Sequence, residues 1–283
     1  MKFKWLIFLF SFIILSATTF GQNIPSFALI TIPKSGSHIM LKTLYFMTKS
    51  PAIWHTKFPS YQYLPPEDGF LYTHFCLSPE LEADYRELPE LKQIILIRDL
   101  RDVAISIVRH IREGVWPGMT HEERENFLKL SFDKQLHYVI NYEYDIWAVK
   151  KKAPNSLQVS LCKVATQAER YSKRNDVLTC RYENLVGPQG GGTLAEQLTE
   201  LENIALFINL SFSQLDLIEI ATNIYGDKED PFGKGAFVNY HSTFTEGKIG
   251  GWRQIFTEAH KEAFKKKLGK SLITLGYEMD DNW

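Results

Sequence analysis

The sequence predicts an α/β fold, a single domain in which helices flank a central parallel β-sheet. Short apolar runs rich in β-branched residues alternate along the chain with segments of helical period, and this alternation is typical of parallel sheets covered on both faces. The 283 residues are 45% hydrophobic and 23% charged, a composition that excludes a disordered protein and allows a substantial core. A glycine-containing loop follows the first expected strand, as in folds that bind phosphate groups.

The first expected strand covers residues 27–32 (FALITI) and leads into the loop 33–37 (PKSGS). The helix after this loop is indicated by apolar residues at helical spacing, namely Ile39, Met40, Leu44 and Met47. A strand, a glycine-containing loop and a helix in this order present backbone N–H groups to an anion. The prediction is therefore an α/β domain of the P-loop nucleotide-binding type.

The later elements alternate in the same way. Further strands are expected at 70–75, 91–97 and 177–181. Helical patterns occupy 99–111, 194–208, 211–225 and 258–268, and residues 122–173 read as mostly helical with an interruption near Pro154. Glycines predict loops at 190–192 and across 226–251.

Three side chains suited to chemistry stand where expected strands end. Lys34, His74 and Arg98 each lie at or just beyond such an end. Ligands of open parallel sheets bind outside the carboxyl ends of the strands. We therefore expect these three residues to lie close together in one site.

The N-terminal segment differs in character from the rest of the chain. Lys2 and Lys4 precede an apolar run over 5–15, small or polar residues follow at 16–19, and Gly21 is a plausible cleavage residue. This layout predicts a signal peptide over residues 1–21, with a short uncleaved anchor as the alternative. Residues 22–283 then form the folded domain. The segment predicts the secretory pathway or membrane association, and the cytoplasm is the alternative if an uncleaved segment leaves the domain there.

Charge and cysteine content exclude several other classes. Lys and Arg total 32 and Asp and Glu total 33, which gives a net charge of −1. A general nucleic-acid binder usually carries a basic excess, so no nucleic acid is expected, and an anionic ligand must be held by a local cluster. Cys76, Cys162 and Cys180 are too widely spaced for a disulfide framework and are expected to be buried free thiols, with one bridge left open. No HExxH motif or clustered ligand set predicts a metal.

Two segments carry groups that suit a phosphate. The loop 33–37 offers backbone N–H groups, the Lys34 ammonium and hydroxyls, but lacks the GxxxxGK[ST] spacing of nucleotide triphosphatases. Arg98 precedes Ser106 by two helical turns, and a guanidinium beside a hydroxyl suits a phosphate monoester. The alternative is that Arg98 pairs locally with Asp99 or Asp102.

Two later segments combine glycines with polar side chains. Residues 244–257 (FTEGKIGGWRQIFT) place Lys248 and Arg253 among closely spaced glycines, which let a backbone approach a ligand. Residues 181–192 (RYENLVGPQGGG) follow a strand and end in a glycine-rich loop.

In this order, the four segments resemble those of sulfotransferases that use 3′-phosphoadenosine 5′-phosphosulfate. PKSGS resembles that family's 5′-phosphosulfate loop, RYENL resembles its YEDL stretch, and GKIGGWR resembles its late glycine loop and following tryptophan. The matches extend from about residue 28 to residue 257. The resemblance implies transfer of a sulfuryl group from that co-substrate to a hydroxyl or amine, without a metal.

The resemblance also implies roles for individual residues. Arg98 and Ser106 match the pair that holds the 3′-phosphate, and Tyr182 matches the tyrosine that faces the adenine. Lys34 matches the lysine that stabilises charge on the leaving phosphate oxygen, and Ser106 would hold it aside until an acceptor arrives. The implied cofactor-binding residues are Lys34, Ser35, Gly36, Ser37, His38, Arg98, Ser106, Tyr182, Gly247, Lys248 and Gly250.

The sequence departs from the family pattern at two places. Ile39 stands where the family has a tryptophan that stacks on the adenine, and an isoleucine has no aromatic face to offer. Thr245 and Glu246 replace an Arg-Lys pair that contacts the 3′-phosphate, so Lys248 is expected to supply the positive charge there.

The catalytic base is expected to be His74. Tyr72, Thr73 and His74 match the family's KTH stretch with tyrosine in place of lysine. Histidine suits proton transfer because its usual pKa lies near neutrality, and activity is then expected to fall on protonation near neutral pH. His38 and His241 are the second and third candidates, and a purely structural His74 is the alternative.

The leading prediction is thus a sulfotransferase with Lys34 and His74 as catalytic residues. The acceptor is expected to be a small molecule or a glycan, and residues 50–70 and 112–135 are expected to line the side of the site where it binds. One alternative is a catalytically impaired protein that still binds the cofactor, and a less favoured one is a P-loop kinase.

Overall fold

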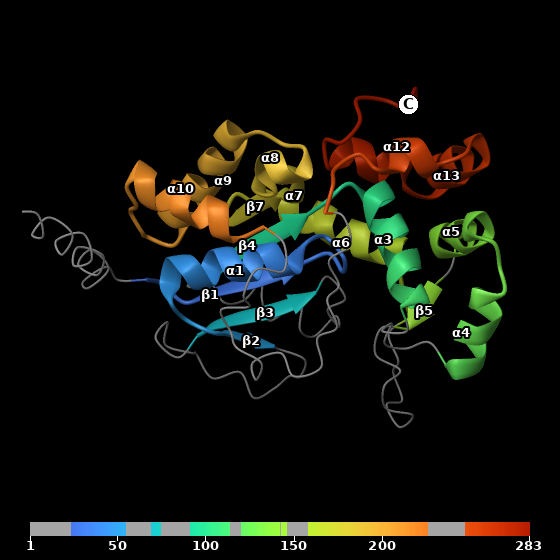
Figure 1. The fold of residues 1–283 in the computed structure, drawn as a ribbon, viewed down its shortest axis with the longest axis horizontal. Coiled ribbons are helices and arrows are strands. Elements are labelled where there is room, and N and C mark those ends of the chain that lie inside the picture. The colour runs from blue at the N-terminus through green and yellow to red at the C-terminus, as the bar shows by residue number, and fades with distance from the viewer. Residues whose placement is uncertain are drawn as a thin grey trace, which may run out of the picture.

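The computed structural model describes residues 24–54, 69–74, 91–113, 120–141, 143–145, 158–225 and 247–283. At its centre is a parallel sheet of five strands in the order β2-β3-β1-β4-β7 (Figure 1). The strands are β1 (Phe27–Thr31), β2 (Ala52–Trp54), β3 (Phe70–His74), β4 (Lys92–Ile97) and β7 (Val177–Arg181). Because β1 lies between β3 and β4 and all three strands are parallel, their carboxyl ends lie side by side at one edge of the sheet.

Helices cover both faces of this sheet. Figure 1 shows α9 and α10 at one side of the view and α5, α12 and α13 at the other. One face is packed by α1 (Ser37–Thr48), α7 (Tyr182–Leu185), α9 (Leu194–Phe207) and α10 (Gln214–Asn223). The other is packed by α3 (Leu100–Arg112), α5 (Phe132–Asn141), α6 (Leu161–Ser172), α12 (Trp252–Ile255) and α13 (Glu258–Thr274). The expected α/β fold with a helix-flanked parallel sheet is confirmed.

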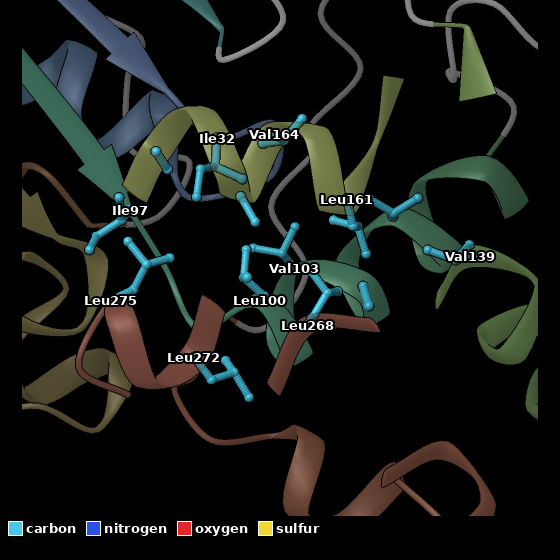
Figure 2. Packing of buried hydrophobic residues seen from close by; sticks show 14 of the residues in the cluster. Ile32, Ile97, Leu100, Val103, Val139, Leu161, Val164, Leu268, Leu272 and Leu275 are labelled. Atoms are coloured by element: carbon cyan, nitrogen blue, oxygen red, sulfur yellow. The ribbon is translucent and has the colours of Figure 1, made fainter. Parts of the chain in front are cut away.

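Alternation along the strands divides the core into two clusters. In β1, Phe27 and Leu29 face the α1 side, whereas Ala28 and Ile30 face the α3 side. All four are buried, which explains why this strand reads as a continuous apolar run. Figure 2 shows part of the second cluster, where residues such as Leu100, Val164 and Leu268 gather from three helices.

The region expected to be mostly helical contains a second sheet. Between α4 (His121–Leu128) with α5 on one side and α6 on the other, β5 (Glu143–Asp145) pairs antiparallel with β6 (Gln158–Ser160). These strands have three residues each, too few for a period of two to stand out from a helical pattern. Pro154 lies outside the described residues.

Smaller differences have local causes. The sequence predicts that the last helix stops at Leu268, yet α13 continues to Thr274. Gly269 is buried within this helix and does not end it. The glycine with a left-handed backbone, which is typical of helix ends, is Gly276. Gly190, the first residue of the expected loop 190–192, instead ends a single helical turn, α8 (Gly187–Gly190), and the chain turns at Gly191.

Several sequence-based expectations lie outside the described residues, namely the segment 1–21, Cys76, His241, Thr245 and Glu246. The other two cysteines are free thiols as expected, although only Cys180 is buried and Cys162 is half-buried. Among the described ranges, no helix combines the length and apolar character needed to cross a bilayer.

Candidate active site

The loop between β1 and α1 carries Lys34 to the carboxyl end of the sheet. Lys34 and Gly36 have φ angles of 67° and 96°, and the Ser35 N–H donates to the carbonyl of Ile32 at 3.0 Å. The chain therefore turns sharply before α1 begins at Ser37. Gly36 is the N-cap and supplies no side-chain cap to the first turn, an arrangement that suits an anionic ligand.

Burial acts on the pKa of Lys34. It lowers the pKa of the ammonium to about 8, with Arg98 lowering it further and Glu113 opposing the shift. Lys34 is still mainly protonated at neutral pH, and an anion placed beside it would raise its pKa again.

Tyr182 closes the loop from the other side. Its ring packs directly on Gly36, where an added Cβ would lie 2.3 Å from Tyr182 Cδ2. Its buried hydroxyl donates to the carbonyl of Gly247 at 2.5 Å. The first loop, the RYENL segment and the late glycine loop therefore meet at this one side chain.

Arg98 lies at the centre of the same junction. Its guanidinium stacks on the Tyr182 ring with Cζ 4.2 Å from the centroid. Nη1 donates to the carbonyl of Lys34 at 3.3 Å and Nη2 to that of Lys248 at 3.1 Å, instead of pairing with the neighbouring Asp99 or Asp102. Arg98 Nε is buried and has no hydrogen-bond partner among the residues that the structure describes, so this side chain retains a donor for a ligand.

Asp102 holds the late glycine loop in place. Its carboxylate accepts the N–H of Gly250 at 2.7 Å and that of Trp252 at 2.9 Å. Burial raises the pKa of this carboxyl, while Arg98 and these two N–H groups act in the opposite direction. Gly250 has a φ of 71°. The Lys248 side chain is exposed, so its carbonyl rather than its ammonium contacts Arg98.

His74 ends β3 beside the end of β1, as the strand-end argument predicts. Thr31 and His74 are register partners, and His74 Nδ1 lies 2.8 Å from Thr31 Oγ1 and 3.3 Å from the Thr31 carbonyl oxygen. Nε2 lies 3.4 Å from the Tyr72 hydroxyl. The half-buried imidazole is thus held by side chains of both strands.

The expected titration of His74 near neutral pH is wrong for this site. Burial lowers its pKa to about 4, and the positive charges of His38 and Lys34 lower it as well, while a hydrogen bond to the Thr31 backbone acts against them. The imidazole is therefore neutral at physiological pH and has a lone pair available to accept a proton.

The remaining predicted residues surround this junction. Ser37 is buried and lies 2.7 Å, oxygen to oxygen, from Thr31 Oγ1. His38 is half-buried, and its charge acts on His74. Ser106 is half-buried on α3; within the described chain no hydrogen bond joins it to Lys34. Ile39 is buried in the core cluster on the α1 side of the sheet, so its side chain offers no surface on which an adenine could stack.

Sequence reasoning missed Thr31 and Asp102. Thr31 is a hydroxyl within an apolar strand, and this polar interruption beside the loop was its only signal. Asp102 was considered only as a local partner of Arg98, because its true partners are about 150 residues away in sequence. In the described ranges no group of three or more His, Cys, Asp or Glu residues could hold a metal ion.

Comparison with known proteins gives a consistent result. The family model described as the sulfotransferase domain matches residues 25–276. The structure is similar to a mouse sulfotransferase complexed with PAP, with a TM-score of 0.61 and 16% identity, covering 89% of this chain and 88% of the other. It is also similar to a retinol dehydratase in complex with androsterone and the inactive cofactor PAP, with a TM-score of 0.56 and 16% identity over 87% and 80% of the two chains. A sequence search of curated proteins gives no significant match.

Proposed function

The chain belongs to the sulfotransferase family, and we propose that it transfers a sulfuryl group from 3′-phosphoadenosine 5′-phosphosulfate to a hydroxyl or amine. The observation that carries this proposal is the position of Arg98. Its guanidinium joins three loops through Lys34, Tyr182 and Lys248, and its buried Nε–H has no partner within the described ranges. A phosphate accepting from this side chain would satisfy that donor.

Each residue of the site has a distinct part in this reaction. The co-substrate supplies an activated sulfuryl group whose bond to the 5′-phosphate oxygen breaks as the acceptor oxygen or nitrogen bonds to sulfur. His74, neutral at physiological pH, accepts the proton of the acceptor. Lys34 stabilises the negative charge that remains on the phosphate oxygen. The loop 33–37 and Arg98 hold the two phosphate groups of the nucleotide.

Nucleotide binding is the first test. At 100 times its dissociation constant, 3′-phosphoadenosine 5′-phosphate should add about 2.7 kcal/mol of stability and raise the melting temperature by about 5–10 °C for a domain of this size. Arg98→Ala should lose most of this rise. Arg109→Ala, which removes the same charge from α3, the helix that begins just after Arg98, is the matched control and should keep it. An unshifted wild-type melting temperature would contradict the proposal.

Transfer is tested with labelled co-substrate and a panel of acceptors. Lys34→Ala should lower turnover by about 10²-fold or more, the scale for losing one preorganised donor, with a smaller effect on nucleotide affinity. Binding without any transfer would instead support the catalytically impaired alternative. Phosphate transfer from ATP would support the kinase.

The acceptor and the location of the protein are also proposals. We propose a small molecule or a glycan as acceptor, because both classes present the hydroxyl or amine that the proposed reaction requires. The sequence of residues 1–21 supports a signal peptide or an anchor, and hence the secretory pathway or a membrane. Mass spectrometry of the N-terminus of the expressed protein tests for cleavage after this segment.

A further inference from the structure

A chain of hydrogen-bonding groups connects the phosphate loop to the candidate base. Ser37 Oγ lies 2.7 Å from Thr31 Oγ1, and Thr31 Oγ1 lies 2.8 Å from His74 Nδ1. Thr31 is fully buried and Ser37 nearly so. The contact between Thr31 and His74 follows from the parallel register of β1 and β3, which sets the two residues side by side at the strand ends.

The direction of this chain is set by its two ends. A phosphate or phosphosulfate oxygen can only accept a hydrogen bond, so a Ser37 hydroxyl bound to it must donate. The lone pair of Ser37 then accepts from the Thr31 hydroxyl, whose own lone pair faces His74 Nδ1. At the other end, the carbonyl oxygen of Thr31 lies 3.3 Å from Nδ1 and can also only accept. Both ends therefore favour a proton on Nδ1.

We propose that the nucleotide anion bound at Ser37 fixes His74, through the Thr31 hydroxyl, in the tautomer with its proton on Nδ1. This inference rests on the proposed function, since it takes the loop 33–37 as the anion site and His74 as the base. Thr31 is then a positioning residue that does not itself touch the substrate. As a result, Nε2 carries the lone pair when the co-substrate is bound. The ability of His74 to accept a proton is therefore coupled to binding of the nucleotide at the loop 33–37.

The surroundings of His74 are compatible with this tautomer. The Tyr72 hydroxyl of the same strand, 3.4 Å from Nε2, can donate to a lone pair there. The positive groups that act on the ring are Lys34 of the loop and His38 of α1, and both oppose protonation of the second nitrogen. Burial acts in the same direction and lowers the pKa to about 4, so a single neutral tautomer rather than an imidazolium carries the base function.

The test is long-range ¹H–¹⁵N NMR of the histidine side chains, which distinguishes the two neutral tautomers, with 3′-phosphoadenosine 5′-phosphate as the probe. His74→Gln identifies the signals of His74 by their loss. In nucleotide-bound wild type we expect the proton on Nδ1. In nucleotide-bound Thr31→Val, which keeps the shape and removes the hydroxyl, we expect a measurable fraction with the proton on Nε2, and Thr31→Ser should restore the wild-type pattern.

Turnover should follow the tautomer. Thr31→Val should lower kcat by about 10- to 100-fold, the range for losing a hydrogen bond that orients a reacting group, and Thr31→Ser should recover most of it. Thr43→Val is the matched control, because it removes another fully buried hydroxyl, one bonded to the carbonyl of Ile39 within α1. It should leave both the tautomer and kcat unchanged.

The outcomes separate this inference from the function on which it rests. A wild-type protein that does not bind the nucleotide overturns both. Nucleotide binding and sulfuryl transfer with the proton on Nε2 overturn only the inference, as does a Thr31→Val variant with wild-type tautomer and kcat. If Thr31→Val does not fold, Thr31→Ser and wild type still decide, because a proton on Nε2 in either bound protein refutes the proposed direction of the chain.

Discussion

Replacing Gly36 by alanine tests whether the phosphate loop and Tyr182 form one packed unit. At a φ of 96°, any residue with a Cβ is strained by about 1–2 kcal/mol. The new Cβ would also lie 2.3 Å from Cδ2 and 2.5 Å from Cε2 of Tyr182. That ring cannot swing aside freely, because its hydroxyl is bonded to Gly247 and Arg98 stacks on its face. Overpacking of this kind adds about 1–3 kcal/mol, so we expect a total loss of about 2–5 kcal/mol.

Gly191→Ala is the matched control for the strain that a Cβ causes at a positive φ, without the clash with Tyr182. Gly191 has a φ of 99°, but its nearest contact for an added Cβ is a side-chain carbon of Ile249 at 3.4 Å. Urea unfolding should therefore show a loss of only about 1–2 kcal/mol for this variant. In a Tyr182→Ala background the extra loss caused by Gly36→Ala should disappear. Equal losses for the two glycine variants would refute the clash with Tyr182.

Three further predictions concern the reaction and the late loop. Burial lowers the pKa of Lys34 to about 8, so its positive charge is present below that pH and lost above it. The value of kcat/KM for the co-substrate should therefore fall as the pH rises past about 8, and Lys34→Arg should shift this fall to higher pH. His74→Ala should lower transfer by about 10²–10⁴-fold and keep the nucleotide-dependent rise in melting temperature, and the acid limb of the wild type should lie near pH 4 rather than near neutrality. Asp102→Ala should weaken nucleotide affinity, measured by calorimetric titration, because the N–H groups of Gly250 and Trp252 lose the acceptor that holds the late loop. The two unsatisfied donors should also lower the free energy of unfolding by about 1–3 kcal/mol each. Unchanged affinity would show that the loop holds its position without this carboxylate.

The meeting of Lys34, His74 and Arg98 could be predicted from sequence because parallel sheets impose it. Lys34 and Arg98 follow, and His74 ends, a run that the sequence identifies as a strand, and the three strands prove to be adjacent in the sheet. The ends of adjacent parallel strands lie at one edge. Local pattern and general topology therefore sufficed for these residues, and no knowledge of specific contacts was needed.

Contacts between distant segments could not be obtained in this way. Asp102 bonds to Gly250 and Trp252, and no periodicity relates positions so far apart. The same holds for the lowered pKa of His74, since the reference value near neutrality describes a solvated imidazole and burial is a property of the packed structure. Short strands such as β2, with three residues, are not predicted from the sequence because a pattern of that length is compatible with several conformations.

The surroundings of Arg98 show why its position matters more than its charge. Three carboxylates lie near it, and each is engaged by another group. Asp99 forms an ion pair with Arg101, whose Nη2 lies 2.8 Å from Asp99 Oδ2. Asp102 accepts two backbone N–H groups. Glu183 accepts hydrogen bonds from the Asp99 N–H at 2.9 Å and from the Tyr277 hydroxyl at 3.1 Å. Within the described part of the chain none of them forms a hydrogen bond with Arg98.

This division of partners depends on Arg101, the fully buried arginine one turn further along. Its guanidinium Cζ lies 3.7 and 4.4 Å from the ring centroids of Trp252 and Trp283, whose planes are 84° apart, and it pairs with Glu278 as well as Asp99. A buried arginine needs such partners because an unpaired charge there is strongly destabilising. By occupying Asp99, Arg101 prevents the carboxylate nearest in sequence from neutralising Arg98. The charge balance of the whole chain, at −1, gives no hint of this arrangement, in which one arginine is held by the protein so that another remains available to an anion.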